Sequence, residues 1–241
     1  MLSPEPRRFP AMEMRPLPKR RPVTIALGFT SLPAVVLCSD TQMTSDSGFK
    51  FEESKMLAAM EGPWSVYGTY AGSPTMAKAV ERQLGEYCYK LLDSQEEGEE
   101  PTLEQFEKQL QKILVRVCGK HRGPLQMLWA LSTKHHVHLL KIDQKTINDV
   151  IDHACLGVGD SSLVRFLLDN LHIVRTQDAA RTAAYVVRQA MRYVDGVGGK
   201  VEIWAIYRRG RNKEIETNKL PGVQQKRLFR RLVSETSAPK P

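Results

Sequence analysis

Three polar residues in the first quarter of this 241-residue chain have types and spacing that suit covalent hydrolysis. Thr24 opens one predicted strand, Asp40 ends the next, and Lys55 follows a short hairpin-like segment. In a hydrolase that uses an N-terminal threonine, the hydroxyl attacks the substrate. The threonine's own α-amine, with an ordinary pKa of about 7.7–8.0, accepts the proton. A lysine ammonium nearby favours the neutral amine, and an aspartate keeps that lysine charged and aimed.

The position of Thr24 sets a condition on this chemistry. Thr24 stands behind 23 residues, so its amine belongs to a peptide bond until the chain is cut before it. Each residue also has an ordinary structural explanation. Threonine favours strands, Asp40 could cap a turn, and Lys55 could be a solvated residue at a sheet edge. Taken singly, each structural explanation is the preferred one, and only the combination of the three residues with Gly72 and Asp195 favours an active site.

Composition restricts the class of protein. Hydrophobic residues make up 41% of the chain and charged residues 26%, which is typical of a globular protein, and the length favours one domain. No run reaches the roughly 18 apolar residues of a membrane helix, and the basic start lacks the apolar segment of a secretory signal. We therefore expect a cytoplasmic protein with no membrane contact. Four cysteines without CxxC spacing are expected to be buried, reduced thiols.

The net charge of +8 is concentrated at the two ends of the chain. We expect a basic, proline-rich leader over residues 1–22, disordered or removed, then a domain over 23–207 and a basic tail over 208–241. Basic ends can bind nucleic acid. However, Phe229 is the one aromatic residue among the tail's charges, so no row of stacking aromatics is present. Solvated ends are the preferred interpretation, and nucleic-acid binding is the weaker alternative.

Hydrophobic periodicity predicts strands, two helices, strands, two helices and a final strand. Ser73 and Pro74 predict a helix start, and Thr102 with Gln105 predicts a capping box. The two helix pairs need separate faces, so two packed sheets with helices on both outer sides are the economical arrangement. The predicted strands cover residues 23–29, 34–39, 49–56, 64–71, 125–133, 136–142, 154–157 and 201–207, and the predicted helices cover 73–91, 102–119, 163–171 and 176–194.

Two further patterns have simpler explanations than a binding site. His135, His136 and His138 lie close together, but no carboxylate or cysteine stands at ligand spacing, so we expect no metal. The glycine pairs beginning at Gly157 and Gly196 lack the strand–GxGxxG–helix context of a dinucleotide site. They are interpreted as tight turns, and no cofactor is expected.

Several motifs in order give the chain a more specific resemblance. These are Thr-Ile-x-x-Gly from Thr24, Ser-Asp-Thr around Asp40, residues 70–73 (Tyr-Ala-Gly-Ser), residues 157–159 (Gly-Val-Gly), and residues 193–195 (Tyr-Val-Asp) before a Gly-Gly strand. Over residues 24–207 the chain resembles a proteasome β-type subunit, the family that includes the HslV peptidase. The resemblance implies an α+β fold, the four-layer αββα sandwich of Ntn hydrolases. It also implies peptide or unfolded-protein substrates, a homo-oligomeric ring and an ATPase unfoldase as partner.

The resemblance also assigns roles to five positions. Thr24 falls on the nucleophile, Lys55 on the active-site lysine and Asp40 on the aspartate that orients it. Gly72 falls on the backbone N–H that stabilises the oxyanion, and Asp195 on a second aspartate near the threonine amine. The implied function is an N-terminal threonine endopeptidase.

Three departures from the family pattern support an alternative. Val158 and Gly198 stand where the family has serines that help to organise the amine, and Val23 stands where a glycine usually precedes the processed threonine. The alternative is a catalytically silent structural or regulatory subunit with the same fold.

Overall fold

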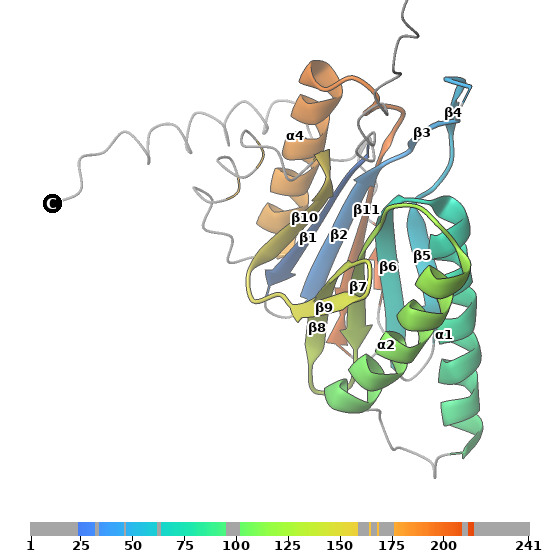
Figure 1. Cartoon of the computed structure of the whole chain (residues 1–241). Coiled ribbons are helices and arrows are strands. Elements are labelled where there is room, and N and C mark those ends of the chain that lie inside the picture. The colour runs from blue at the N-terminus through green and yellow to red at the C-terminus, as the bar shows by residue number, and fades with distance from the viewer. Residues whose placement is uncertain are drawn as a thin grey trace, which may run out of the picture.

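The computed structural model describes residues 24–31, 34–45, 47–61, 64–94, 102–158, 164, 168, 176–208 and 212–214 (Figure 1). These residues form two five-stranded antiparallel sheets, a separate hairpin and three long helices. The first sheet contains β1 (Ile25–Ser31), β2 (Ala34–Asp40), β10 (His153–Gly157), β11 (Val201–Tyr207) and β12 (Asn212–Glu214). The second contains β5 (Met56–Met60), β6 (Ser65–Gly72), β7 (Leu125–Ser132), β8 (Val137–Asp143) and β9 (Thr146–Asp149).

The sheet order brings the two ends of the domain together. The first sheet runs β10-β1-β2-β11-β12, so the last long strand, β11, lies beside β2. The second sheet runs β5-β6-β7-β8-β9 in simple sequence order. The chain passes from one sheet to the other through the hairpin of β3 (Gln42–Thr44) and β4 (Lys50–Glu52), which extends beyond both sheets in Figure 1.

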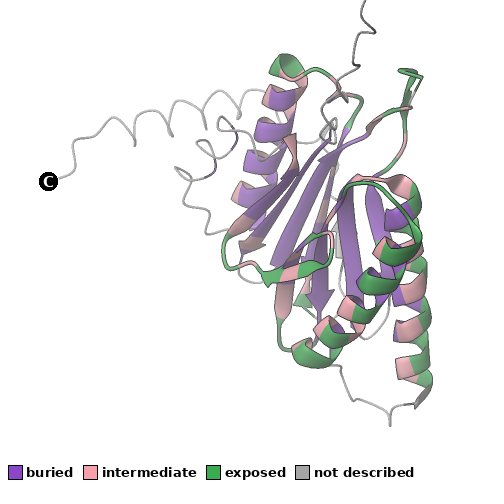
Figure 2. Cartoon of the chain, viewed as in Figure 1, coloured by how far each residue is buried: buried purple, intermediate pink, exposed green. Residues whose placement is uncertain are grey.

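Three apolar clusters separate four layers. Inward-facing residues of both sheets form the central cluster, which includes Leu37, Leu128 and Leu139. The outer face of the second sheet packs against α1 (Pro74–Ser94) and α2 (Leu103–Lys120). The outer face of the first sheet packs against α4 (Thr176–Tyr193). Figure 2 shows buried residues on the sheets and on the inner sides of these helices. The predicted αββα sandwich is confirmed.

Local signals set the helix boundaries as the sequence predicts. Helix α1 begins at Pro74, directly after Ser73, because proline has no N–H to leave unpaired in the first turn. Helix α2 begins after Thr102, whose hydroxyl accepts from the Gln105 N–H, while the Gln105 side chain accepts from the Thr102 N–H. The predicted capping box is therefore confirmed.

The structure differs from the sequence prediction between the hairpin and the second sheet. A single strand over 49–56 is wrong, because β4 ends at Glu52 and β5 begins at Met56. At this break the chain moves from the hairpin into the second sheet. The short edge strands β9 and β12 were not predicted. The predicted leader, most of the predicted tail and most of the helix predicted over 163–171 lie outside the described residues.

Candidate active site

Neighbouring strands of the first sheet bring Thr24 and Asp40 together. Strands β1 and β2 are antiparallel, with Ala26 opposite Ser39, so the start of β1 lies beside the end of β2. Thr24 directly precedes β1, and Asp40 is the last residue of β2. The Ile25 N–H donates to Asp40 Oδ1 at 3.1 Å. The backbone next to Thr24 is therefore fixed to the carboxylate that the sequence assigns to the site.

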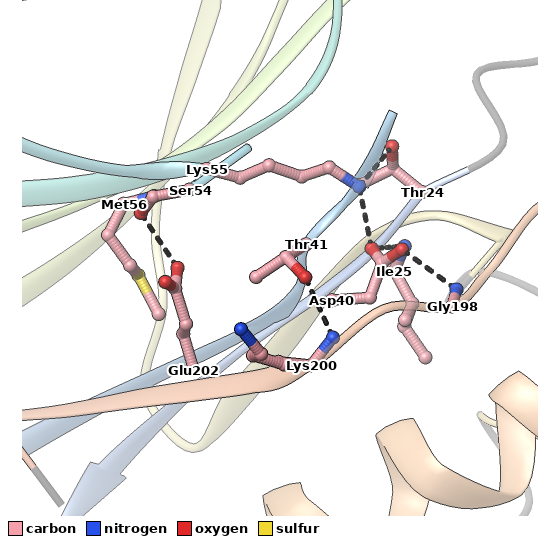
Figure 3. A network of polar contacts seen from close by, with 10 residues as sticks. All are labelled: Thr24, Ile25, Asp40, Thr41, Ser54, Lys55, Met56, Gly198, Lys200 and Glu202. Atoms are coloured by element: carbon pink, nitrogen blue, oxygen red, sulfur yellow. Dashed lines mark hydrogen bonds and ion pairs between the residues drawn. The ribbon is translucent and has the colours of Figure 1, made fainter. Parts of the chain in front are cut away.

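Lys55 reaches this pair from the second sheet. It lies just before β5, and its Nζ lies 2.8 Å from Asp40 Oδ1 and 3.1 Å from Thr24 Oγ1 (Figure 3). Asp40 and Lys55 are fully buried, and Thr24 is 7% exposed. Because an ammonium can only donate, Thr24 Oγ1 accepts this hydrogen bond and keeps its own proton. The structure thus brings together the three residues singled out from the sequence.

Two opposing effects act on the charge of Lys55. Burial lowers the pKa of Lys55 from its ordinary value, because a desolvated ammonium is disfavoured. The charge of Asp40 and its hydrogen bond raise the same pKa without cancelling the effect of burial. The result is a lysine that loses its proton more easily than a surface lysine and depends on Asp40 to stay charged.

Two glycines with positive φ shape the space around Thr24. Gly157, at the end of β10, has a φ of 63°, and a Cβ there would lie 2.1 Å from the Thr24 carbonyl oxygen. The next residue, Val158, donates its N–H to that oxygen at 2.9 Å. Gly72 ends β6 with a φ of 107°, where a Cβ would lie 2.2 Å from the Pro124 carbonyl oxygen. Both positions therefore need glycine.

The two sheets meet beside these glycines. A Cβ on Gly157 would lie 3.3 Å from the Cβ of Ala71, the residue before Gly72. Gly72 is therefore at the same end of the sandwich as Thr24. Its role as an oxyanion donor stays a prediction.

Asp195 is not part of the contacts around Thr24. It is exposed in the turn after α4 and makes no hydrogen bond or ion pair with the described residues. Gly198, three residues later, donates its N–H to Asp40 Oδ2 at 3.2 Å. The turn predicted to carry the second aspartate thus reaches the site through a backbone group. The role of Asp195 also stays a prediction.

Sequence reasoning missed contacts that depend on the backbone. The N–H groups of Val158 and Gly198 hold Thr24 and Asp40, and side-chain types give no signal for such bonds. It also missed a hydrogen bond of 2.7 Å from Ser54 Oγ to Glu202 Oε2, which ties the residue before Lys55 to β11. A Ser and a Glu separated by 148 positions carry no pattern that could reveal this contact.

The histidine cluster lies at the other end of β7, with His135 and His136 in the turn before β8 and His138 within β8. The His135 and His136 rings are 6.4 Å apart, and the His136 and His138 rings are 5.9 Å apart. Within the described part of the chain, no three His, Cys, Asp or Glu residues form a group that could hold a metal ion. No helix in this part is both long enough and apolar enough to cross a membrane. None of the four cysteines forms a disulfide; Cys118 is half-buried, and Cys38, Cys88 and Cys155 are buried.

Comparison with solved structures gives close matches in fold. The "Anbu (ancestral beta-subunit)" of Yersinia bercovieri has a TM-score of 0.70 at 13% identity, covering 90% of this chain and 99% of that one. An Anbu mutant from Hyphomicrobium sp. strain MC1 has a TM-score of 0.69 at 13% identity, covering 90% and 98%. The Anbu complex of Pseudomonas aeruginosa, described as a helical assembly, has a TM-score of 0.63 at 13% identity, again covering 90% and 98%.

These matches place the chain in a structural class. Its fold is the four-layer αββα sandwich of proteasome-like β-subunits. No protein-family model matches the chain, and no curated protein matches it significantly. The likeness therefore concerns the fold, and only the residues of the site bear on an activity.

Proposed function

We propose that this protein is an N-terminal threonine hydrolase that cleaves peptide bonds, with Thr24 as its nucleophile. One observation carries the proposal: Lys55 Nζ contacts both Thr24 Oγ1 and Asp40 Oδ1 in a buried setting. A buried lysine–aspartate pair is costly to desolvate, and a hydrophobic pair of similar volume often serves stability as well. Its presence beside a threonine hydroxyl favours a chemical role.

The proposed reaction begins once the peptide bond before Thr24 is cut. Thr24 Oγ1 attacks the substrate carbonyl carbon while its proton passes to the free α-amine. The Lys55 ammonium stabilises negative charge on the attacking oxygen, and the Gly72 N–H would donate to the carbonyl oxygen as it becomes an oxyanion. The protonated α-amine then gives its proton to the leaving amine, which leaves an ester on Thr24. Water hydrolyses the ester with the α-amine again as base, and Asp195 would support the amine.

A catalytically silent subunit with the same fold is the second candidate. The observation in its favour is that Val158 and Gly198 contribute backbone N–H groups and no side-chain hydroxyl. With no hydroxyl at either position, the free amine would depend on Asp195, backbone groups or water. Loss of one organising hydrogen bond typically costs about 0.5–1.5 kcal/mol, or roughly two- to twelvefold in rate. An active form of this site would therefore be slow.

The deciding experiment exposes Thr24 after the full chain has folded. Residues 20–23 are replaced by the recognition sequence of a protease that cuts after its own site, so that Thr24 becomes the first residue. Intact mass confirms the cut. A peptide epoxyketone then tests the site, because its ring-closed adduct needs both the hydroxyl and the free amine of an N-terminal threonine.

One adduct per cut chain is expected, with none on the uncut chain and none on a cut Thr24→Ala variant. The cut protein should also release the fluorophore from a fluorogenic peptide. If it neither forms the adduct nor cleaves peptides, the hydrolase proposal is wrong, and the silent subunit becomes the preferred function.

We also propose that the chain acts as a homo-oligomer, in a ring or a related assembly, with an unfoldase supplying its substrates. The matched Pseudomonas aeruginosa structure is described as a helical assembly of its complex, which supports an assembled state for a chain of this fold. In such an assembly the active threonines would be enclosed, so that only unfolded chains could reach them. A leader over residues 1–22 and a cytoplasmic location remain part of this proposal.

A further inference from the structure

Lys55 is the central residue of a turn that Ser54 closes. The Ser54 hydroxyl accepts a hydrogen bond of 3.2 Å from the Met56 N–H, two residues further along the chain. Such a side-chain bond across one residue fixes the backbone of the residue between. The same hydroxyl donates to Glu202 Oε2 at 2.7 Å, and Figure 3 shows Glu202 below this turn. The Glu202 carboxylate thereby orients the hydroxyl that shapes the backbone of Lys55.

Glu202 lies on the strand whose leading turn also contacts Asp40. In β11, Val201 is opposite Asp40 and Glu202 is opposite Ser39. The turn before β11 provides the Gly198 N–H that donates to Asp40 Oδ2. One segment, from Gly198 to Glu202, therefore holds both members of the buried ion pair. It contacts Asp40 directly and reaches Lys55 through Ser54.

Charge adds to this geometry. The carboxylates of Asp40 and Glu202 both raise the pKa of Lys55, against the lowering effect of burial. Two more acidic residues, Glu52 and Glu53, lie just before Lys55 in the chain, but each forms its own ion pair. Glu52 pairs with Lys200, and Glu53 pairs with Lys78. Among the described residues, Glu202 forms no ion pair, and its contact is with the Ser54 hydroxyl. Its charge is thus left to act on the lysine.

We propose that Glu202 is a positioning residue of the Thr24 site. Through Ser54 it fixes the turn that aims Lys55 at Thr24, and its carboxylate helps to keep this lysine charged. Its effect on reaction rate rests on the proposed hydrolase function, whereas its effect on Lys55 does not. The two can therefore be tested separately.

The first test follows the titration of Lys55 in the uncut full chain by NMR with 13Cε-labelled lysine, with the Lys55 signal assigned from a Lys55→Met variant. Glu202→Gln keeps an oxygen for Ser54 but removes the charge, so the titration should move to lower pH. Glu52→Gln is the matched control, because it removes a nearby carboxylate that is paired with Lys200. An unmoved titration in Glu202→Gln, or an equal shift in Glu52→Gln, would overturn the proposal.

The second test uses the cut protein and the epoxyketone. Ser54→Ala removes the hydroxyl but keeps the charge of Glu202, so the reaction should slow about fivefold with an unchanged pH profile. Ser54→Thr should restore the rate. Glu202→Gln should move the basic limb of the profile to lower pH, because the reaction needs the Lys55 ammonium. A wild-type rate in Ser54→Ala would contradict the positioning role. If the cut wild-type protein fails to react at all, the hydrolase proposal fails, and the lysine titration alone decides on Glu202.

Discussion

Replacing Asp40 with asparagine should lower the free energy of unfolding of the protein by several kcal/mol, about as much as breaking a buried ion pair typically costs. Asp40 Oδ1 accepts from Lys55 Nζ and the Ile25 N–H, and Oδ2 accepts from the Gly198 N–H. Asparagine removes the negative charge. Because both carboxylate oxygens of Asp40 accept hydrogen bonds, the NH₂ group of asparagine would face an N–H donor in either orientation. At 2.8 Å and an effective dielectric constant of about 20, the lost attraction to Lys55 is roughly 6 kcal/mol before desolvation is counted. Removing one partner of a buried pair typically costs about 3–5 kcal/mol, which is the loss expected here.

The loss should depend on pH in a defined direction. Asp40 raises the pKa of Lys55, so Asp40→Asn lowers that pKa further below the unfolded value of about 10.4. A lysine with a lowered folded pKa destabilises the fold at low pH, where it must be charged in both states. This cost shrinks as pH rises from the folded pKa towards the unfolded pKa. The destabilisation by Asp40→Asn should therefore be larger at pH 6 than at pH 9.

Urea unfolding followed by the fluorescence of the buried Trp64 and Trp129 measures these free energies. A double-mutant cycle of Asp40→Asn, Lys55→Met and the variant that carries both changes then measures the coupling between the two side chains. Because the double variant leaves no unpaired charge, it should be more stable than Asp40→Asn alone. Additive single losses, to within about 0.5 kcal/mol, would refute the idea of a strongly coupled pair. A destabilisation by Asp40→Asn that is independent of pH would refute the assigned effect on Lys55.

Four further outcomes are expected. Gly157→Ala should lower the free energy of unfolding in urea by more than about 2 kcal/mol, because the new Cβ would lie 2.1 Å from the Thr24 carbonyl oxygen at a φ of 63°. As a control, Gly119→Ala in α2, where a Cβ would have no neighbour within 4 Å, should leave this free energy unchanged or raise it by up to about 1 kcal/mol. In the cut protein, Lys55→Ala should abolish peptide cleavage and Lys50→Ala, at an exposed position on β4, should not; the reverse result would show that the lysine is wrongly assigned. Burial raises the pKa of the Cys88 thiol to about 12, so Cys88 should resist iodoacetamide at pH 8 while folded and react in urea, as peptide mass mapping can show. Light scattering should give a mass several times that of the 27.3 kDa chain at micromolar concentration, and a monomer throughout would contradict the proposed assembly.

Sequence patterns located the parts of the site that depend on side-chain type. Thr24 and Asp40 lie at strand boundaries that hydrophobic runs and turn residues mark in the sequence, whereas Lys55 falls inside the strand predicted over 49–56; the structure brings all three into contact. The αββα fold follows from the alternation of groups of strands with helix pairs, and the capping box at Thr102 follows from local chemistry alone. For the strand boundaries and the capping box, the signal lies within a few residues of the feature that it predicts, whereas the fold is predicted from the order of elements along the domain.

Features that depend on distant segments could not be predicted in this way. The break at residues 53–55 arises because the Glu53 N–H donates to the Thr41 carbonyl and Ser54 binds Glu202, while the local sequence reads as one strand. The Gly198 N–H lies near Asp40 only because β11 pairs with β2 across most of the chain length. Edge strands such as β9 carry few apolar residues, so their pairing leaves little trace in hydrophobic periodicity.

The origin of the site in two sheets has a consequence for the order of folding. Thr24 directly precedes β1 and Asp40 ends β2, two strands that are close in sequence and can pair early, whereas Lys55 lies just before the first strand of the second sheet. A partly folded chain with one sheet formed therefore holds the hydroxyl without the ammonium that contacts it. The contact among the three residues arises only when the sheets dock and the central apolar cluster closes. Completion of this contact is thus linked to the burial of the central apolar cluster, so a chain whose two sheets have not docked would carry no assembled nucleophile.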